Sequence, residues 1–444
     1  MSDQNAPATT VLQHPPGFRP RRGLNWFTVG LAYASFYMCR YNLAIANKDI
    51  CEEFHFSRQE FGYILTAFFW AYAVGQLING LITDKIGGKR AMICGVFGTV
   101  VLNIAFGAAS TAGMLSVFVL IRMLDGYTQA FGAPGMIKIN ASWFHKTERG
   151  TFAGIFGFMI QLGRFVINWL GPALLAGLSV WGLVTLPPLH WKYVFWVPAG
   201  IACVSAVLVA IFVKETPEEA GFKMAGEDSG PVDDTPVDVL HVLKVILSNR
   251  FVWVVAGAYF CTGVVRQGLD QWFTRYLQDV FSLDLKGSTY QWIAFMIPFV
   301  AVIGSLGSGM ISDRFFGGQR APVAVTLYFC QVAAILIGAQ FQSLTAACIS
   351  LTLISLTVNA THSILGTAAA MDIGGRKMAG FASGVIDSFQ YFGAGLAGFA
   401  LGKLLDWGGW GWWYYSMAPF GLIGGLLMMT MLGKQDIQVK SEGH

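Results

Sequence analysis

Charged residues are scarce in this sequence. Only 12% of the 444 residues are Asp, Glu, Lys or Arg, whereas 55% are hydrophobic. An ordinary soluble domain carries about a quarter charged residues, and a chain this apolar cannot cover itself with a water-facing surface. Lipid must therefore be the solvent for much of the molecule, which excludes a conventional soluble globular protein.

The sequence also lacks the motifs of a catalytic or metal-binding protein. Its seven cysteines include no C-x-x-C pair and fall mostly in apolar stretches, which argues against a disulfide framework or a metal site. There is no G-x-x-x-x-G-K-S/T loop, no H-E-x-x-H and no Cys/His cluster. We therefore expect no enzyme, no cofactor and no nucleic-acid partner. Without a nucleotide-binding loop, any energy that the chain uses must come from a solute or ion gradient.

Long apolar runs, in contrast, are abundant. A membrane-spanning helix needs about 20 apolar residues. The runs of roughly this length are 25–48, 59–83, 91–111, 115–139, 151–178, 192–213, 251–279, 289–312, 321–342, 345–370, 378–403 and 411–433. They predict an all-α membrane protein with 12 transmembrane helices in the lipid bilayer.

One long polar stretch divides these runs into two sets of six. It contains the sequence KETPEEAGFKMAGEDSGPVDDTP, starting at Lys214. The expected parts of the chain are an N-terminal tail (1–24), a first six-helix half (25–213), a linker (214–250), a second six-helix half (251–433) and a C-terminal tail (434–444).

Basic residues gather in the loops on one side of the predicted membrane. This side holds Arg19, Arg21, Arg22, Lys85, Lys89, Arg90, Lys146, Arg149, Lys214, Lys223, Arg314, Arg320, Arg376, Lys377 and Lys434. The other side has only a few, such as Arg58, Lys192, Arg275 and Lys286. Because basic loops stay in the cytoplasm, we expect both termini and the linker to be cytoplasmic, in a bacterial-type inner (plasma) membrane.

The two halves repeat one another. The segment Gly80–Arg90 (GLITDKIGGKR) follows the second run, and Gly309–Arg320 (GMISDRFFGGQR) follows the eighth. Two six-helix halves related by a pseudo-twofold axis are the architecture of an alternating-access transporter. Its site lies between the halves, near the middle of the bilayer.

Both repeated loops resemble the signature loop of the major facilitator superfamily, and Arg122–Gly126 (RMLDG) resembles a pattern of its fourth helix. The resemblance covers essentially the whole chain and implies that superfamily's fold. Asp84 and Asp313 lie at cytoplasmic helix ends, where pairing with basic loop residues such as Arg90 and Arg320 would latch the halves in one state. The alternative is that these loops only set the topology.

Two arginines lie within predicted membrane helices. Arg40 is near the middle of the first run, and Arg266 is near the middle of the seventh. A charge at this depth is costly unless it is paired or hydrated, so it marks a candidate functional site. Because the runs are equivalent in the two halves, both guanidinium groups are expected to face one cavity and grip an oxyanion such as phosphate. The alternative is neutralisation by a buried carboxylate, and Asp270 could pair with Arg266 in this way.

At these positions the chain resembles the organophosphate:phosphate antiporter family, which includes bacterial glycerol-3-phosphate, hexose-phosphate and phosphoglycerate carriers. Arg40 follows Tyr33 and Tyr37, and Arg266 precedes Trp272, as in that family. The resemblance implies that the two arginines together bind the phosphate of the substrate.

Two further positions extend this resemblance. Gln129 lies in the stretch GYTQAFGAPG, which is similar to a fourth-helix stretch of the family, and Tyr391 matches a cavity tyrosine of the eleventh helix. The chain departs from the family pattern at Gly75-Gln76 in place of Ser-Lys, at Ala133-Pro134-Gly135 in place of Trp-Pro-Pro, at Ile160 in place of a histidine and at Gly263 in place of a tyrosine. The arginine pair is kept while the rest of the pocket differs, so the substrate stays open.

A third cation, Arg164, lies midway along the fifth run. It would suit a substrate with a carboxylate as well as a phosphate, such as a phosphoglycerate. Alternatively, it pairs with an acidic residue of a neighbouring helix, for example Asp125, Asp372 or Asp387. The intramembrane His362 is expected to be a neutral, hydrogen-bonded residue and not part of a proton relay.

The leading hypothesis is a monomeric exchanger of a small phosphorylated organic anion for inorganic phosphate. Its predicted substrate contacts are Arg40, Arg266, Tyr33, Tyr37, Gln129, Arg164 and Tyr391. One alternative is a proton-coupled carboxylate transporter, in which Arg164 and Asp387 would matter more. Another is a membrane sensor of sugar phosphates built on the same fold.

Overall fold

The structure is a computed structural model that describes residues 15–144, 149–180, 184–222, 248–317, 319–341 and 343–433. Within these ranges, the side chains of 149–156, 178–180, 184–186 and 367–383 are not described. Some residues used above to predict orientation or pairing therefore lie outside the described residues: Lys146, Lys223 and Lys434 entirely, and Arg149, Asp372, Arg376 and Lys377 by their side chains.

Almost all of the described chain is helical. The elements up to residue 222 are α1 (Phe18–Ile45), α2 (Asn47–Phe54), α3 (Arg58–Ile86), α4 (Gly88–Ala108), the short 3-10 helix η1 (Ala109–Thr111), α5 (Leu115–Gln129), α6 (Gly132–Trp143), α7 (Arg149–Ala176), strands β1 (Leu178–Val180) and β2 (Val184–Leu186), α8 (Tyr193–Phe212) and, within the predicted linker, the 3-10 helix η3 (Glu218–Ala220). The elements after it are α10 (Arg250–Asp270), α11 (Phe273–Phe281), α12 (Ser288–Phe315), α13 (Arg320–Gln340), α14 (Leu344–Ser363), the π-helix η4 (Ile364–Ala369), α15 (Ala370–Gly408) and α16 (Gly411–Met429).

The predicted membrane fold of twelve helical crossings is confirmed, although α5 and α6 together build one crossing, and the short helices α2 and α11 follow α1 and α10 on one side of the bundle. By length and composition, eight of the described helices are long and apolar enough to cross a membrane. The pieces α5 and α6 are shorter because the helix breaks between Gln129 and Gly132, just before Pro134, whose ring lacks a backbone donor. The antiparallel β1–β2 hairpin was not predicted.

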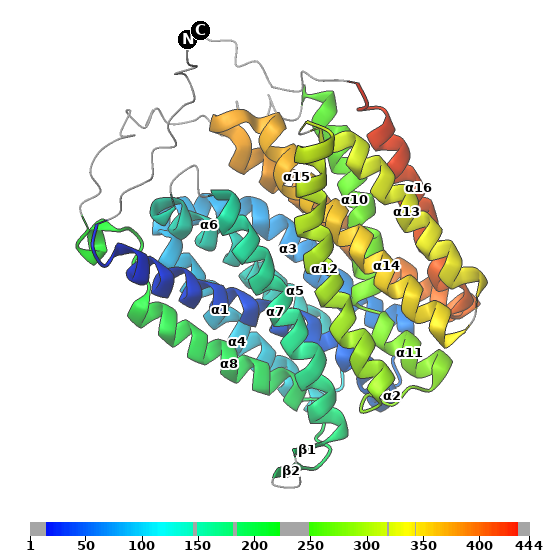
Figure 1. Ribbon diagram of the computed structural model, residues 1–444. Coiled ribbons are helices and arrows are strands. Elements are labelled where there is room, and N and C mark those ends of the chain that lie inside the picture. Colours follow the sequence, from blue (N-terminus) through cyan, green and yellow to red (C-terminus); the bar gives the residue numbers. More distant parts are fainter. Residues whose placement is uncertain are drawn as a thin grey trace.

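The helices form two groups (Figure 1). One group contains α1 to α8 and the other contains α10 to α16, and the main contacts between them are those of α3 with α15 and of α7 with α12. We call the end of the bundle where α1 begins and α16 ends the tail side, and the opposite end, which carries β1 and β2, the hairpin side.

Glycine allows α3 and α15 to touch at their backbones. A Cβ atom on Gly62 of α3 would lie 2.4 Å from the carbonyl oxygen of Gly398 in α15. Such close approach of two helices through small residues is a common packing mode in membranes. The first and second halves therefore meet along a tight seam on one flank of the molecule.

On the hairpin side, polar contacts join the two halves. Arg58 at the start of α3 pairs with Asp279 of α11, with 3.3 Å between Nη2 and Oδ2. Asp406 of α15 accepts hydrogen bonds from the backbone N–H groups of Arg58 at 3.0 Å and Gln59 at 2.8 Å. A carboxylate from the second half thus caps the N-terminus of a helix of the first half.

On the tail side, the ion pairs between described residues stay within one half. Lys138 of α6 lies 3.5 Å from Asp84 of α3, and Arg320 of α13 lies 2.7 Å from Asp313 of α12. The structure therefore has its hairpin side closed between the halves, whereas the described ion pairs of the tail side leave the halves unlinked.

Candidate functional site

A cavity of about 450 Å³ lies between the two halves. Its described lining comes from both groups of helices: Tyr33, Tyr37, Tyr72, Gln76, Ala133, Met136, Ile137, Gly157, Phe158, Ile160, Gln161, Tyr259, Arg266, Val302, Ser305, Leu306, Asn359, His362, Ser363, Gly366, Asp387 and Tyr391. Residues such as Met136 and Leu306 lie in the tail-side parts of α6 and α12. The cavity thus extends from the level of Arg266 toward the tail side.

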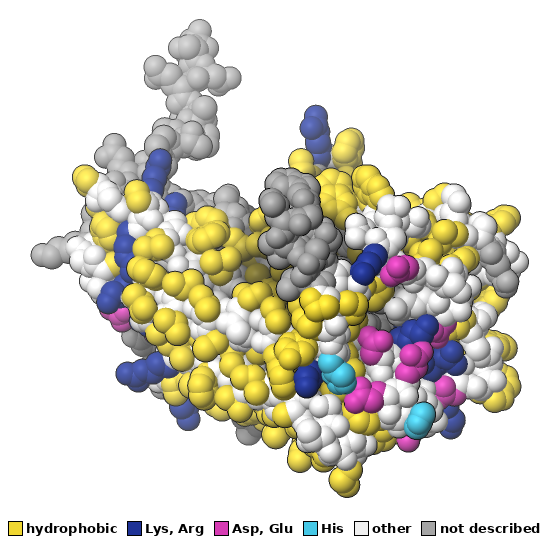
Figure 2. Space-filling model, turned by 90° about the horizontal axis from the view of Figure 1, so that it is seen from below, with side chains coloured by type: hydrophobic (Ala, Val, Ile, Leu, Met, Phe, Trp, Pro, Cys, Tyr) yellow, Lys and Arg dark blue, Asp and Glu magenta, His cyan; other side chains and the backbone are white. Residues whose placement is uncertain are grey.

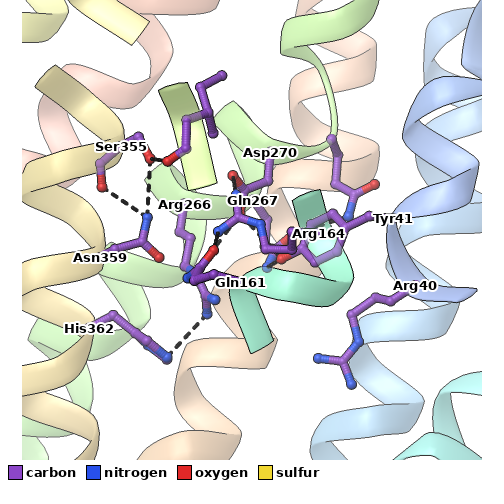
Figure 3. A network of polar contacts seen from close by, with 12 residues as sticks. Arg40, Tyr41, Gln161, Arg164, Arg266, Gln267, Asp270, Ser355, Asn359 and His362 are labelled. Carbon is purple, nitrogen blue, oxygen red and sulfur yellow. Dashed lines mark hydrogen bonds and ion pairs between the residues drawn. The ribbon is translucent and has the colours of Figure 1, made fainter. Parts of the chain in front are cut away.

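Arg266 of α10 lines this cavity, and its side chain is only 2% exposed. Its Nη1 lies 3.3 Å from Nε2 of His362 in α14 (Figure 3). Since a guanidinium group can only donate, Nε2 of His362 must be the acceptor. In a neutral ring the proton then sits on Nδ1, which lies 2.5 Å from the hydroxyl of Tyr259 and donates to it.

His362 therefore has a larger place in the site than the sequence suggested. It is a hydrogen-bonded intramembrane histidine, as expected, but it also lines the cavity and orients Arg266. Its ring stacks on that of Tyr259, with 5.3 Å between the ring centroids and 21° between the planes. These contacts hold the Arg266 guanidinium toward the second-half wall of the cavity.

Arg40 of α1 lies one layer behind the cavity wall. Its guanidinium carbon is 4.6 Å from the ring centroid of Tyr37 and 4.4 Å from that of Tyr72. Its Nη1 donates to the hydroxyl of Tyr391 at 3.1 Å. These three tyrosines line the cavity, whereas Arg40 is absent from its described lining. The expectation that both arginines face the same space therefore needs a correction: in this state, aromatic rings separate Arg40 from it.

The contacts of Arg40 explain how its charged guanidinium group is stabilised behind the cavity wall. Cation–π contacts with several rings stabilise a guanidinium group that has left water. Its Nε also donates to Oε1 of Gln129 in α5 at 3.2 Å. Among the described ion pairs, none joins Arg40 to a carboxylate. The positive charge of Arg40 is thus shielded by aromatic rings and amides but not cancelled.

A buried network in α5 fixes the backbone of α1 at this point. Arg122 donates to the carbonyl oxygens of Cys39 at 3.1 Å and of Arg40 at 2.9 Å, and it pairs with Asp125 at 2.7 Å. The amide nitrogen of Gln129 donates to Asp125 at 3.2 Å. The residues of the RMLDG segment therefore position Arg40 from behind and neutralise one another.

Asp270 of α10 joins the halves beside the cavity. It forms a short ion pair with Arg164 of α7, its Oδ2 accepts from the hydroxyl of Tyr41 at 3.2 Å, and the same oxygen lies 3.9 Å from Nε of Arg266. Figure 3 shows Arg164 and Arg266 on either side of Asp270, while Arg40 stands apart. The Asp270 side chain is fully buried, so the two cations and the Tyr41 hydroxyl stabilise its charge in a low-dielectric surrounding.

This arrangement corrects two predictions about pairing. Arg164 does not line the cavity and does not pair with either of the described candidates, Asp125 or Asp387. Asp125 is already engaged by Arg122, and Asp387 accepts from the amide of Gln76 at 3.0 Å. Asp270, which was considered only for Arg266, is shared between the two arginines and is closer to Arg164.

The predicted tyrosines form a ladder on one face of α1. Tyr33, Tyr37 and Tyr41 follow one another at four-residue spacing, with ring centroids 5.5 Å and 6.0 Å apart. Tyr391 of α15 packs on Tyr72 of α3 with a centroid separation of 4.3 Å. Tyr33, Tyr37 and Tyr391 line the cavity as expected, and Gln129 lies behind it beside Arg40.

The predicted gating residues lie away from the cavity, on the tail side. Asp84 and Asp313 make the within-half pairs described above, Arg320 is the partner of Asp313, and Arg90 is exposed. In this state these residues do not bring the halves together in any described ion pair.

Tyr72, Tyr259 and Asn359 also line the cavity, although the sequence did not predict them as lining residues. A pattern could have found one of them. Tyr33 precedes Arg40 by seven residues, and Tyr259 precedes Arg266 by the same interval. Seven residues are about two helical turns, so each arginine has an equivalent tyrosine on its own helix face.

Comparisons with known proteins give a consistent picture. The family model described as Major Facilitator Superfamily matches residues 29–398. The membrane sensor protein UhpC of Escherichia coli is 26% identical over 424 residues, which cover 92% of this chain and 91% of that protein. The glycerol-3-phosphate transporter of Bacillus subtilis is 27% identical over 390 residues, with coverages of 85% and 84%.

A third relative is the hexose-6-phosphate:phosphate antiporter of Salmonella typhimurium, 24% identical over 394 residues, with coverages of 86% and 82%. Among solved structures, a bacterial homologue of the human lysosomal transporter Spinster, in an inward-facing and unoccupied conformation, superposes with a TM-score of 0.73 at 14% identity. The match covers 93% of this chain and 97% of that chain. At this identity the likeness shows the fold alone.

Proposed function

Because this chain belongs to the Major Facilitator Superfamily, we propose that it exchanges a small phosphorylated organic anion for inorganic phosphate across the inner membrane. The chain is a multi-pass membrane transporter and not an enzyme. The observation that carries the proposed substrate is the pair Arg40 and Arg266. These are two buried guanidinium groups from equivalent helices of the two halves. The described ion pairs give Arg40 no carboxylate, and Arg266 shares Asp270 with Arg164.

The phosphoryl group would bind first at Arg266, which already lines the cavity. Its Nε makes no hydrogen bond and lies 3.9 Å from Asp270, so donor capacity remains for an anion. Arg40 would bind the same anion once its Nη1 moves from the hydroxyl of Tyr391 to the anion. This requires a small shift of the tyrosine rings that separate Arg40 from the cavity. Tyr33 and Tyr37 would contact the anion or its organic part.

The charge balance of the site favours an anionic ligand. Arg40, Arg164 and Arg266 face the carboxylates of Asp270 and Asp387, while Arg122 and Asp125 cancel one another. With both carboxylates ionised, one positive charge is left without a counter-ion near the middle of the bilayer. An uncompensated charge there is costly, so an empty site resists the transition and a bound anion relieves it. This is the physical basis of obligate exchange.

Asp270 would couple binding to the conformational change. In this structure Asp270 is shared by Arg266 of its own half and by Arg164 and Tyr41 of the other half. A phosphate that draws Arg266 away leaves Asp270 to the first-half groups alone. Binding would therefore alter the contacts between the halves beside the cavity.

The orientation and the gates belong to the same proposal. The tail side, which carries most of the basic loop residues, would be cytoplasmic together with both termini, so this state opens to the cytoplasm. In the opposite state, Asp84, Arg90, Asp313 and Arg320 would link the halves on the tail side. The chain would act as a monomer with no nucleic-acid partner, and its halves would span 25–213 and 251–433 with 214–250 as the linker.

Counterflow in proteoliposomes tests this function. Vesicles loaded with inorganic phosphate and carrying the purified protein should take up radiolabelled phosphate from outside. Glycerol-3-phosphate, hexose-6-phosphates and phosphoglycerates added outside should compete according to their affinity. Uptake equal to that of protein-free vesicles, for all of these anions, would contradict the proposal.

A membrane sensor of sugar phosphates is a second candidate, because UhpC is among the relatives. A sensor would bind the same ligands at the same arginines and would give no counterflow. Thermal stabilisation by an organophosphate without measurable flux would favour the sensor, since a ligand stabilises the state that it binds. The carboxylate carrier loses its main support, because Arg164 is engaged by Asp270 and lies outside the cavity lining.

A further inference from the structure

A second cavity, of about 600 Å³, lies apart from the central one, between α7 of the first half and α12 of the second. Its lining is Phe165, Asn168, Trp169, Pro172, Ala173, Gly177, Leu285, Lys286, Ser288, Gln291, Trp292, Ala294 and Phe295. It shares no lining residue with the central cavity. We call it the α7–α12 cleft.

The cleft has aromatic walls and an unfilled centre. Trp169 is 52% exposed and Trp292 is 60% exposed. The rings of Phe165 and Phe295, which also line the cleft, meet edge to face, with 5.5 Å between centroids. The lining also includes Pro172 and Ala173 of α7 and Gly177 just after it, whose small side chains fill little of the space. The hollow is large and apolar enough to hold an acyl chain.

The length of the cleft matches one leaflet of a bilayer. Its lining on α7 runs from Phe165 to Gly177, and a helix rises 1.5 Å per residue, so the cleft is about 18 Å long. One leaflet contributes about half of the 30 Å hydrocarbon core. The cleft runs from the hairpin-side end of α7 toward the middle of the bilayer, which is the path of one acyl chain.

The mouth of the cleft is polar and carries a cation. Lys286, Ser288 and Gln291 lie at the hairpin-side start of α12, and Lys286 is exposed. The described ion pairs give its ammonium group no carboxylate partner. Its backbone N–H instead donates to Oδ1 of Asp284 at 3.0 Å. A lysine and an aspartate thus stand two residues apart at the level of the lipid head groups.

Asp284 faces a third, smaller cavity of about 400 Å³ on the hairpin side, and Leu285 lines both this cavity and the α7–α12 cleft. The same small cavity holds Asp49, Glu52 and Glu53 of the first half. Figure 2 shows acidic and basic side chains gathered on one part of this face, next to broad hydrophobic areas. A cation site and an acidic patch therefore adjoin at the cleft mouth.

We propose that the α7–α12 cleft binds a phospholipid with an amine head group, with its phosphodiester at Lys286, its ammonium near Asp284 and an acyl chain between Trp169 and Trp292. The acidic patch would repel a head group with net negative charge and would attract an ammonium group. An N-trimethylated head group has no N–H to donate to a carboxylate, so it is the weaker ligand. The aromatic rings fit the interfacial depth of such a lipid.

The lipid would affect the exchange cycle because it contacts α7 and α12, which belong to different halves and move relative to one another. The amide of Asn168 donates to the carbonyl oxygen of Ala294 at 3.4 Å, so the back of the cleft is itself a contact between the halves. A lipid lodged against this contact stabilises the state in which the hairpin side is closed. Movement of α7 against α12 changes the cleft, so the lipid binds the two states differently.

Native mass spectrometry of the full chain tests the proposal. The protein is released from detergent micelles containing equal amounts of phosphatidylethanolamine, phosphatidylglycerol and phosphatidylcholine with identical acyl chains. One phosphatidylethanolamine should be retained, at least 10-fold over the other two lipids. Lys286→Ala should lower its retention at least 10-fold, and Asp284→Asn should lower the preference over phosphatidylcholine at least 3-fold.

Lys192→Ala is the matched control, because Lys192 is also a hairpin-side lysine but lies outside the cleft, just before α8, with its Nζ 5.2 Å from the ring centroid of Trp196. It should leave lipid retention unchanged. Trp292→Ala, an exposed position, should weaken retention of every lipid. Equal retention of the three lipids by the unaltered protein, or unchanged retention in Lys286→Ala, would overturn the proposal. Neither result depends on phosphate exchange, so the lipid site and the transport function can fail separately.

Discussion

The two ends of the bundle are closed to different degrees. On the hairpin side, Asp279 accepts hydrogen bonds from Nη2 of Arg58 at 3.3 Å, from Nε of Arg275 at 3.4 Å and from the indole N–H of Trp410 at 3.1 Å. The ammonium group of Lys48 lies 3.9 Å from the same carboxylate. Two of these partners come from the other half. On the tail side, the described ion pairs Lys138–Asp84 and Arg320–Asp313 each lie within a half.

This difference between the two ends indicates how the halves can be joined on the hairpin side while they stay apart on the tail side. The hairpin-side contacts are partly buried, so their charge-assisted hydrogen bonds are worth more than exposed pairs. The tail-side pairs are more exposed, with Asp84 at 77% and Asp313 at 65% side-chain exposure. The closed end is therefore the stabilised end of this state, and the following predictions test that asymmetry.

The largest effect is expected from Asp279→Asn. The amide keeps one acceptor but loses the charge that binds Arg58 and Lys48 across the halves, at a cost of about 1.5–3 kcal/mol. In a cysteine-free background, spin labels at Glu52→Cys and Thr289→Cys mark the hairpin-side ends of the two halves. The population with a long distance between the labels should rise about 10-fold or more. An unchanged distance distribution would show that Asp279 does not hold this side closed.

A smaller shift is expected from Asp406→Ala, which removes the cap that the second half places on α3. Caps are worth about 1 kcal/mol, so the open population should rise roughly fivefold in the same measurement. Ser57→Ala is the matched control, because Ser57 caps the same helix from within its own half. It should lower the melting temperature to a similar extent without opening the hairpin side. Equal opening by the two variants would refute a role of Asp406 between the halves.

A still smaller effect is expected at the other end. Asp313→Asn breaks the exposed pair with Arg320, and exposed pairs contribute about 0.2–1 kcal/mol. The label distances of the ligand-free protein should change less than twofold in population. A large shift toward the closed hairpin side or away from it would show that the tail-side pairs already act between the halves in this state.

The last prediction concerns the stability of the hairpin side and not its closure, and it involves pH and Asp49 of α2, which lies outside the membrane-spanning helices. Burial and the nearby Glu52 raise the pKa of Asp49 from 3.8 to about 6. The folded protein then binds this proton more tightly than the unfolded chain, so the free energy of unfolding falls as the pH rises from about 4 to 6. Asp49→Asn should remove this decline, gaining about 1 kcal/mol at pH 7 after solvent screening.

Melting temperatures of the two proteins across this pH range give the comparison for Asp49. Parallel curves from pH 4 to 7 would mean that Asp49 titrates normally. His190 and Lys48, which lower the same pKa, remain in both proteins, so their own contributions cancel in the difference.

Much of the architecture follows from the sequence. Apolar runs of helical length and the spacing of the loops gave all twelve crossings, since lipid allows few alternatives to a hydrogen-bonded helix. Arg40 and Arg266 were found because a charge within an apolar run is rare. The break between Gln129 and Gly132 and the β1–β2 hairpin were missed, because hydropathy does not report local backbone conformation.

The details of the site depend on packing between the halves. The sequence could not decide which carboxylate meets Arg164, because Asp125, Asp270 and Asp387 are all within helices that such a fold brings together. Nor could it place Arg40 behind Tyr37 and Tyr72, because that arrangement comes from rings on different helices. Both features also belong to one conformational state, and a sequence encodes more than one.

The central claim is that Arg40 and Arg266 together bind a phosphoryl group. Isothermal titration calorimetry of inorganic phosphate into the purified protein tests it most directly, with Arg266→Lys, Arg40→Lys and Arg320→Lys measured alongside. A lysine keeps the charge but loses the bidentate fork, so the first two variants should bind phosphate at least about 10-fold more weakly, or about 1.4 kcal/mol. Arg320→Lys should bind normally. Unchanged phosphate affinity in both Arg40→Lys and Arg266→Lys would contradict the account.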